Sequence, residues 1–331
     1  AAGASSPNSQ SDPARSKDAR VEFFHKQTSF PFMATRKVWY GLSAVLMIIC
    51  FASFVTRGLN YAIDFTGGVS VNATFPGTAD VDKVRSALEA AQFRDPQVQN
   101  FGSSRDIAIR LLPITGQTGD IIRANIEKVL KTVDPGAQIL SLEVVGPQVG
   151  AELKSSAIWA LSFTLLLIFM YIALRFHTWR LSLGAILAVL HDPILVLGVF
   201  SITQTSFDLP VVAAILAVIG YSLNDTVVVF DRIRERFEAS RRLAPAVALD
   251  QAINQTLSRT IMTKVVTSIV VVALLFLGGP VLRGFSEAML IGIIAGTYSS
   301  IYISSSIALD CGLKAEHVFP TTKKTAVDHL P

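Results

Sequence analysis

The chain has 331 residues, of which 51% are hydrophobic and 16% charged, and its mean hydropathy is +0.48. A soluble domain usually carries about 25% charged residues, so the surplus apolar side chains are expected to face lipid. The net charge of +4 comes from short connections rich in Lys and Arg, which argues against a nucleic-acid-binding surface. The two cysteines, Cys50 and Cys311, exclude the disulfide framework of a small secreted protein.

Six stretches are long and apolar enough to cross a bilayer as helices, for which about 20 residues are needed. They span residues 38–55, 157–174, 181–202, 209–230, 262–277 and 285–309. Lys and Arg, which are retained on the cytoplasmic side, precede the first stretch and follow the second and the fourth. This bias predicts a multi-pass membrane protein with both termini in the cytoplasm.

The predicted organisation follows in chain order. Residues 1–35 form a cytoplasmic, largely disordered tail without the apolar core of a signal peptide. The first transmembrane helix occupies residues 36–57 and is followed by an extracytoplasmic domain over residues 58–153. The other five transmembrane helices lie within residues 154–310, before a cytoplasmic tail over residues 311–331.

The extracytoplasmic segment has the pattern of an α+β domain. Alternating or β-branched residues predict strands at 61–75, 97–103, 106–112 and 138–146. Helical apolar spacing marks residues 80–93 and 118–133, and an Asp lies near the start of the first of these helices. The resulting βαββαβ order is the ferredoxin-like split βαβ pattern, with helices on one face of the sheet.

Several segments together resemble the SecF branch of the SecD/SecF family, within the resistance-nodulation-division (RND) superfamily of proton-driven membrane proteins. They are YAIDFTGG, VQNFGSS, VVGPQVGAEL, GYSLNDTVVVFDRIRE and LGGPVLRGFSEAMLIGIIAGTYSSIYISSSIAL. Their order and spacing extend the resemblance over residues 36–317.

The resemblance implies a protein-export subunit of the bacterial cytoplasmic (inner) membrane. It implies a heterodimer with SecD, whose six spans complete a twelve-helix RND arrangement, and association of the pair with the SecYEG channel. YajC and the insertase YidC are further implied partners, and the translocating preprotein is the substrate. The proton-motive force would drive movements of the extracytoplasmic domains. No enzyme activity, cofactor, metal or nucleic acid is expected.

Asp225 in the fourth span is the most informative polar residue, because a carboxylate inside a transmembrane helix costs about 2.5–3.5 kcal/mol on insertion scales. Tyr221 and Ser222 lie four and three positions before it, so their hydroxyls are expected to hydrogen-bond the carboxylate or organise water. A proton relay is the favoured interpretation. The alternative is a side chain that extends to the interface near Asp231.

Arg259, Thr263 and Thr267 recur every four residues in the fifth span, and this stripe is expected to face Asp225. Protonation of the Asp would then release the Arg and change helix packing. The resemblance links this Asp and this Arg to proton conduction; the alternative for Arg259 is a simple interfacial charge. Lys264 departs from the family pattern, and it either reaches the cytoplasmic interface or competes with Arg259 for Asp225.

His191 and Asp192 lie near the middle of the third span and precede Pro193, which suggests a local kink. Proton handling is one interpretation, because His titrates near neutral pH. A structural or pairing role is favoured for His191. Successive helical residues point about 100° apart, so the two side chains are not expected to share one face fully.

Two groups of small residues predict structural roles. In the sixth span, Gly292, Gly296, Ser300 and Ser304 form a stripe at spacing four that permits close helix packing, either internally or with SecD.

The other group is Asp64, Gly67 and Gly68, just after the first span, where the glycines loosen the strand or allow a bulge. This motif is interpreted as a joint between helix and strand, with a hinge that transmits movement to the outer domain as the alternative.

Two other function classes are disfavoured. A small-molecule or lipid exporter of the same superfamily is expected to have twelve spans in one chain or a larger outer domain. An intramembrane aspartyl protease needs two carboxylates at one site. Only Asp192 and Asp225 lie deep enough, and neither lies in a protease-like motif.

Overall fold

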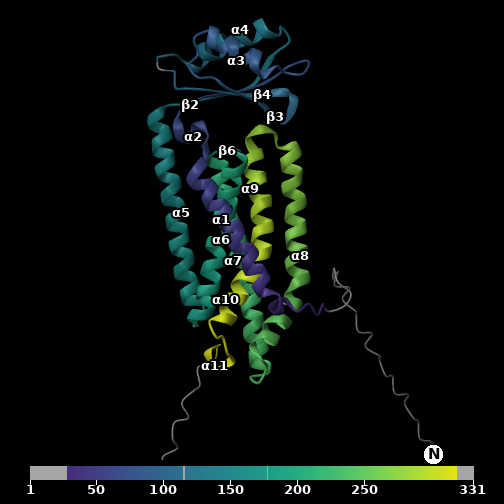
Figure 1. Cartoon of the computed structure of the whole chain (residues 1–331). Coiled ribbons are helices and arrows are strands. Elements are labelled where there is room, and N and C mark those ends of the chain that lie inside the picture. Colours follow the sequence, from purple (N-terminus) through teal and green to yellow (C-terminus); the bar gives the residue numbers. More distant parts are fainter. Residues whose placement is uncertain (1–27, 115, 177, 319–331) are drawn as a thin grey trace, which may run out of the picture.

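The computed structural model describes residues 28–318 except Thr115 and His177, and it consists of a helical bundle with a small sheet domain over one end (Figure 1). Within these residues, six helices are long and apolar enough to cross a membrane, as the hydropathy pattern predicts. They are α1 (Arg36–Arg57), α5 (Pro147–Arg175), α6 (Trp179–Thr203), α7 (Leu209–Ala239), α8 (Pro245–Leu277) and α9 (Gly279–Tyr298), which continues through the π-helical segment η2 (Ser299–Ile303) into α10 (Ser304–Asp310).

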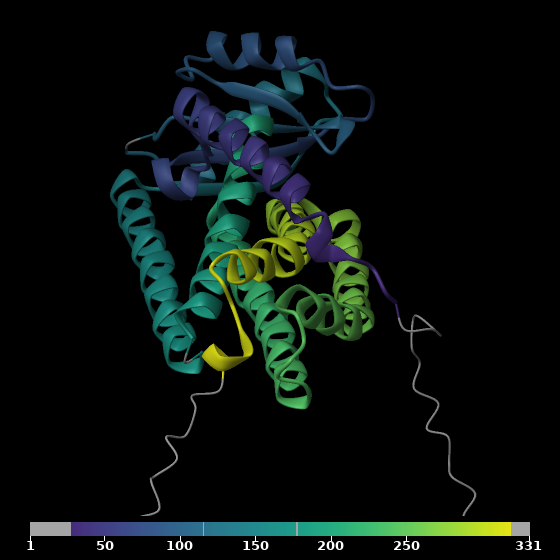
Figure 2. The same ribbon diagram turned by 60° about the horizontal axis from the view of Figure 1, so that its bottom comes forward.

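The bundle has an inner and an outer set of helices. More than half of the residues in the apolar windows of α6, α7 and the α9–η2–α10 helix are buried, whereas fewer than a fifth are buried in α1, α5 and α8. Helices α5 and α8 stand on opposite sides of the bundle (Figures 1 and 2). Large apolar side chains on the outer set, such as Phe51, Trp159 and Ile269, are exposed and suited to lipid or to another membrane subunit.

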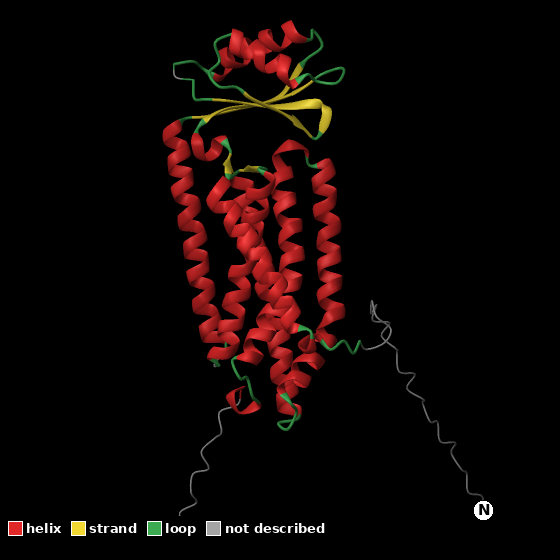
Figure 3. Ribbon diagram, in the orientation of Figure 1, coloured by secondary structure: helices red, strands yellow, loops and turns green. Residues whose placement is uncertain are grey.

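The sheet domain follows the predicted βαββαβ order. Its elements are β2 (Gly68–Thr74), α3 (Val81–Ala90), β3 (Gln97–Phe101), β4 (Ser103–Leu111), α4 (Gly119–Val133) and β5 (Gln138–Val145). The strands are antiparallel in the order β3-β4-β2-β5, and α3 and α4 cover the face away from the bundle (Figure 3). Apolar residues of both helices, including Leu88 and Ile126, pack on Val71 and Ile109 of the sheet.

The predicted first strand, residues 61–75, is wrong in its first half. The two-residue strand β1 (Asn60–Tyr61) pairs in parallel with β6 (Ser206–Phe207), and the short helix α2 (Ile63–Thr66) separates it from β2. Gly67 and Gly68 adopt φ values of +70° and +131°, which L-residues rarely reach, so the chain changes direction here before the strand begins.

The first of these glycines, Gly67, packs backbone to backbone against the start of α5. A Cβ on Gly67 would lie 2.8 Å from the Cα of Pro147, and a Cβ on Gly150 would lie 2.8 Å from the backbone N of Gly67. No side chain fits between these segments. The contact therefore joins both chain connections of the sheet domain at one point above the bundle.

Three helices extend beyond the apolar stretches that predict them. Helices α5 and α8 begin at Pro147 and Pro245, and α7 continues through its basic segment to Ala239. Proline is favoured in the first helical turn because backbone N–H groups there have no intrahelical acceptor, so the N–H that proline lacks is not needed. A hydropathy pattern locates only the apolar part of a helix that spans the bilayer, so it does not detect the polar turns at the helix ends.

The predicted tails lie mostly outside the described residues, namely at 1–27 and 319–331. The described part of the N-terminal tail docks on α8: the backbone N of Met33, in the short 3-10 helix η1 (Phe32–Ala34), donates to Asp250 at 2.8 Å. Phe30 and Asn254 exchange two further hydrogen bonds. At the other end, the short helix α11 (Ala315–Val318) follows α10.

We expect Gly150→Ala to destabilise the protein by about 1–3 kcal/mol, because the added methyl group overlaps the backbone of Gly67. Gly146→Ala is the matched control, since its Cβ meets no atom within 4 Å and its φ is −68°. Thermal unfolding of the two variants in nanodiscs would measure the difference. Equal unfolding temperatures would contradict the tight contact.

Candidate functional site

A buried ion pair joins α7 and α8 inside the bundle. Lys264 Nζ lies 2.8 Å from Asp225 Oδ2, and the two side chains are only 6% and 8% exposed. Apart from each other, these two atoms have no hydrogen-bond partner among the described residues. Lys264 Nζ also lies 4.5 Å from the centre of the Tyr221 ring, a cation–π contact. The ammonium group therefore depends on Asp225 for its neutralisation.

In the structure, the hydroxyl and guanidinium groups expected near Asp225 do not bond it directly. Tyr221 donates to the carbonyl of Thr263 at 2.9 Å and shares a 2.7 Å hydrogen bond with the hydroxyl of Thr267. Arg259 is exposed and forms no ion pair with Asp225 in the described part of the chain, but its positive charge is near enough to act on the Asp225 carboxylate. Lys264 follows Thr263 by one position, about 100° around the helix, and it is this face of α8 that meets Asp225.

Ser222 also departs from its expected role, because it binds a different carboxylate. Its hydroxyl donates to Oδ2 of Asp192 at 2.5 Å, and the hydroxyl of Ser299 donates to the same oxygen at 2.9 Å. Asp192 is completely buried. It therefore forms a second polar centre, at which α6, α7 and η2 meet.

His191 extends this centre to α1. Its Nδ1 lies 3.2 Å from Oδ1 of Asp192, and its Nε2 lies 2.8 Å from the hydroxyl of Ser43. The two neighbouring side chains thus contact each other although they leave α6 in different directions. Helix α6 continues through Pro193 without interruption, although proline leaves the carbonyl of Val189 without its usual N–H donor.

The small-residue stripe of the sixth span packs inside this chain. Gly292 contacts Val218 of α7, and a Cβ on Gly296 would lie 3.1 Å from Ser222 and 3.4 Å from Asp192. The predicted spacing of four does not persist, because the π-helical turn inserts an extra residue. As a result Ser299 faces Asp192, and the Ser300 hydroxyl bonds the carbonyl of Thr297 instead. Ser304 contributes a backbone contact to Gly184 of α6.

A third polar group lies under the sheet, at the N-terminus of α7. Oδ1 of Asp208 accepts from the backbone N of Val211 at 2.9 Å, and Oδ2 of Asp64 accepts from the backbone N of Leu209 at 2.9 Å. Both carboxylates border a cleft of about 500 Å³ that Arg110 of β4 also lines. Burial, reinforced by the negative charge of Asp64, raises the pKa of Asp208 to about 6.

The motif YAIDFTGG identified Asp64 from sequence, but Asp208 and Arg110 were missed. The available signal for Asp208 was its place before Leu-Pro at the start of an apolar stretch, which is typical of a helix N-cap. For Arg110 there was none, because its role depends on which face of the sheet it occupies.

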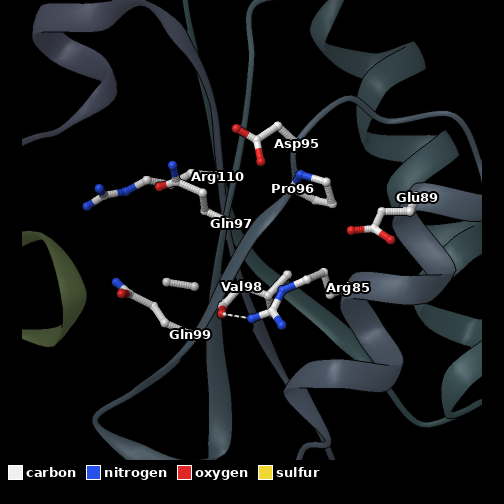
Figure 4. Close-up of a pocket in the computed structure, with 9 residues that line it drawn as sticks. Arg85, Glu89, Asp95, Pro96, Gln97, Val98, Gln99 and Arg110 are labelled. Carbon is white, nitrogen blue, oxygen red and sulfur yellow. Dashed lines mark hydrogen bonds between the residues drawn. The ribbon is translucent and has the colours of Figure 1, made fainter.

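A smaller cavity of about 290 Å³ lies beside β3 (Figure 4). Arg85 from α3 donates to the carbonyl of Val98 at 3.3 Å there, whereas Arg110 points to the opposite face of the sheet. Within the described residues no group of three or more His, Cys, Asp or Glu side chains is placed to hold a metal ion. The polar centres of the bundle and the cleft under the sheet are therefore the candidate functional sites.

Comparisons with known proteins agree on one family. The family model described as "Protein export membrane protein SecD/SecF, C-terminal" matches residues 125–314, and the "SecD/SecF GG Motif" matches residues 52–75. "Protein translocase subunit SecF" of Haemophilus influenzae is 45% identical over 300 residues, which is 91% of each chain. The protein of the same name from Escherichia coli O157:H7 is 42% identical over 296 residues, 89% of this chain and 91% of the relative.

The structure is similar to that of SecDF from Thermus thermophilus, described as a translocon-associated membrane protein. The TM-score is 0.78 at 37% sequence identity, over 86% of this chain. A second SecDF structure, in a "Super-membrane-facing form", gives a TM-score of 0.64 at 36% identity, over 87% of this chain. In both cases this chain covers 39% of the SecDF chain.

We expect Lys264→Met to destabilise the protein by about 3–5 kcal/mol, because it leaves the Asp225 carboxylate buried and unpaired. Asp225→Asn should be destabilising for the same reason, and the double variant should cost less than the sum of both. Arg259→Met, an exposed control, should change stability by less than about 0.5 kcal/mol. Additive effects in this double-mutant cycle would argue against the pair.

The raised pKa of Asp208 makes a pH-dependent contribution to stability. Its pKa of about 6 exceeds the ordinary value of 3.8, so the folded protein holds this proton more tightly and loses stability as pH rises from about 4 to 7. We expect Asp208→Asn, which keeps the N-cap, to unfold at nearly the same temperature as wild type at about pH 3, where the carboxyl is mostly protonated in both the folded and the unfolded protein. At pH 7.5 it should unfold roughly 2–4 °C higher. A difference that does not change with pH would refute the assignment.

Proposed function

Because the chain belongs to the SecD/SecF family of protein-export membrane proteins, we propose that it acts as the SecF subunit of a protein translocase. With a SecD partner it would use the proton-motive force to promote translocation and release of preproteins across the bacterial inner membrane. The observation that carries the proton coupling is the Asp225–Lys264 pair, a carboxylate and an ammonium group buried together between two transmembrane helices.

The proposed orientation places the sheet domain outside the cytoplasm. Arg175 and Arg180, as well as the Arg-rich link between α7 and α8, lie at the end of the bundle away from the sheet (Figure 1). Positive charge in short connections favours the cytoplasmic side, which supports an extracytoplasmic sheet domain and cytoplasmic termini.

Two observations support a membrane partner. The outer helices α1, α5 and α8 expose most of their apolar surface, and the similar SecDF chains are more than twice as long as the region that this chain covers. A SecD-like chain would supply the missing half. Contacts with SecYEG, YajC and YidC are proposed from the family resemblance alone.

The ion pair provides a way to convert proton binding into movement. A proton on Asp225 removes the negative charge that neutralises Lys264, and an unpaired ammonium group in this position is strongly unfavourable. Lys264 must then move toward water or another acceptor, which shifts α8 relative to α7. One charge that crosses 100 mV supplies about 2.3 kcal/mol, enough to change a conformational equilibrium roughly fiftyfold.

Helix α7 links this pair to the sheet domain. At its N-terminus, the backbone N of Leu209 donates to Asp64, which belongs to the connection between α1 and the sheet, and β1 pairs with β6 immediately before α7. Asp64, Gly67 and Gly68 would therefore act as the joint through which a displacement of α7 reaches the sheet domain.

An intramembrane protease remains the disfavoured alternative. Its two catalytic carboxylates would have to share one site, but Asp225 pairs with Lys264 whereas Asp192 binds two serines and His191.

The test is proton-motive-force-dependent export of a reporter preprotein in cells depleted of this protein. We expect Asp225→Asn, compared with wild type at an equal membrane level and equal SecD binding, to lose most of the proton-dependent export. Arg259→Met tests whether the exposed arginine contributes as the family resemblance implies.

The matched control is Asp231→Asn, which removes a half-exposed carboxylate from the same helix, where it pairs with Arg175 at 2.6 Å. This control should retain export. Full complementation by Asp225→Asn would disprove the proposed coupling role.

A further inference from the structure

Asp192 differs from Asp225 in having no cation beside it. It lies at the fourteenth of the 25 residues of α6 and is completely buried. Among the described residues no Lys or Arg forms an ion pair with it, and its one ionisable hydrogen-bond partner is His191, at 3.2 Å. A lone carboxylate at this depth would be costly, so the His191–Asp192 pair has to hold a proton to be neutral.

The partners of Asp192 can accommodate a proton without rearrangement. A serine hydroxyl donates to a carboxylate and, after rotation about its C–O bond, accepts from a carboxylic acid. Ser222 and Ser299 can therefore satisfy Oδ2 in both protonation states. Protonation of Asp225 instead leaves Lys264 without a partner. The two carboxylates are thus suited to different tasks, proton storage and movement.

Three departures from regular helix structure surround Asp192. Pro193 follows it in α6, Gly296 of α9 leaves room for its carboxylate, and the π-helical turn of η2 presents Ser299. Each feature costs helix stability, and π-helical turns occur frequently at functional sites. Together they place two serine hydroxyls on the Asp192 carboxylate. A buried helix contact can be packed without such a polar group.

Ser222 bonds one carboxylate, Asp192, and shares a helix with the other, Asp225. It precedes Asp225 by three residues of α7, so both lie on one face, with Ser222 about 4.5 Å nearer the sheet-domain end of the helix. The other polar groups around the centre are Ser43 of α1, which bonds His191, and Tyr298, whose ring lies 5.8 Å from the imidazole. Lys264 of α8 is held by Asp225.

We propose that Asp192, together with His191, is a second proton-binding site, which takes up protons from the sheet-domain side and passes them through Ser222 to Asp225. The Asp192 carboxyl gives its proton to the Ser222 oxygen, and the hydroxyl proton of Ser222 moves to the Asp225 carboxylate when that side chain rotates into reach. Asp192 ends as the carboxylate and Asp225 as the acid. This step rests on the proposed function, because it assumes that Asp225 accepts transported protons.

The test uses the full chain with its copurifying partner in proteoliposomes, with an imposed pH gradient. We expect Asp192→Asn and Ser222→Ala to slow proton uptake, followed by an internal pH dye, roughly 10- to 100-fold. Ser300→Ala is the matched control, since Ser300 is equally buried but its hydroxyl bonds a backbone carbonyl of its own helix. This control should leave proton uptake unchanged.

Infrared difference spectra of the same samples, recorded during a pH change, separate a proton-binding role from a structural one. Among the protonated-carboxyl bands of wild type, one should disappear in Asp192→Asn and a different one in Asp225→Asn. Unchanged uptake in Asp192→Asn, or slowed uptake with no band assignable to Asp192, would overturn the inference.

Two further results keep the inference separable from the proposed function. If Asp192→Asn does not accumulate, Ser222→Ala serves as the test, because it retains the Asp192 carboxylate. Wild-type proton uptake in Ser222→Ala would overturn the relay. Full export by Asp225→Asn would disprove the proposed coupling function. The infrared band of Asp192 would still show whether the Asp192 carboxyl binds a proton.

Discussion

A charge inside a bilayer must be neutralised by the protein itself, and the inner helices of this chain are arranged around that requirement. Asp225 is neutralised by Lys264 of a neighbouring helix, whereas Asp192 is surrounded by hydroxyls and an imidazole. Both solutions need helices in close contact. The glycines of α9 allow this, because their missing side chains bring Val218 and Ser222 of α7 against the backbone.

The long helix α7 connects the polar residues inside the bundle to those beneath the sheet. It carries Ser222 and Asp225 inside the bundle, and its N-terminus binds the carboxylates of Asp208 and Asp64 beneath the sheet. Favourable interaction with the helix dipole holds these carboxylates in place, while burial and then the negative charge of Asp64 raise the pKa of Asp208. Helix α7 is thus linked by a direct hydrogen bond to the segment that leads from α1 into the sheet.

Sequence pattern succeeded where one physical variable dominated. Lipid imposes length and apolarity on a spanning helix, so all six spans could be located, and the alternation of the sheet domain predicted its βαββαβ order. Pattern failed where several helix faces were equally plausible. The stripe of Arg259, Thr263 and Thr267 was expected to face Asp225, but the adjacent position, Lys264, does so, because the rotation of α8 is set by its packing on α7 and α9.

By itself, the sequence determined the membrane class, the number of spans, the sheet domain and the identity of the costly polar residues, since each of these follows from local composition or spacing. Tertiary structure alone decided which residues are partners. Ser222 lies three residues from Asp225 but bonds Asp192, thirty residues away, and the π-helical turn brings Ser299 to the same carboxylate. Spacing along one helix defines its faces, but only the packing of several helices determines which faces meet.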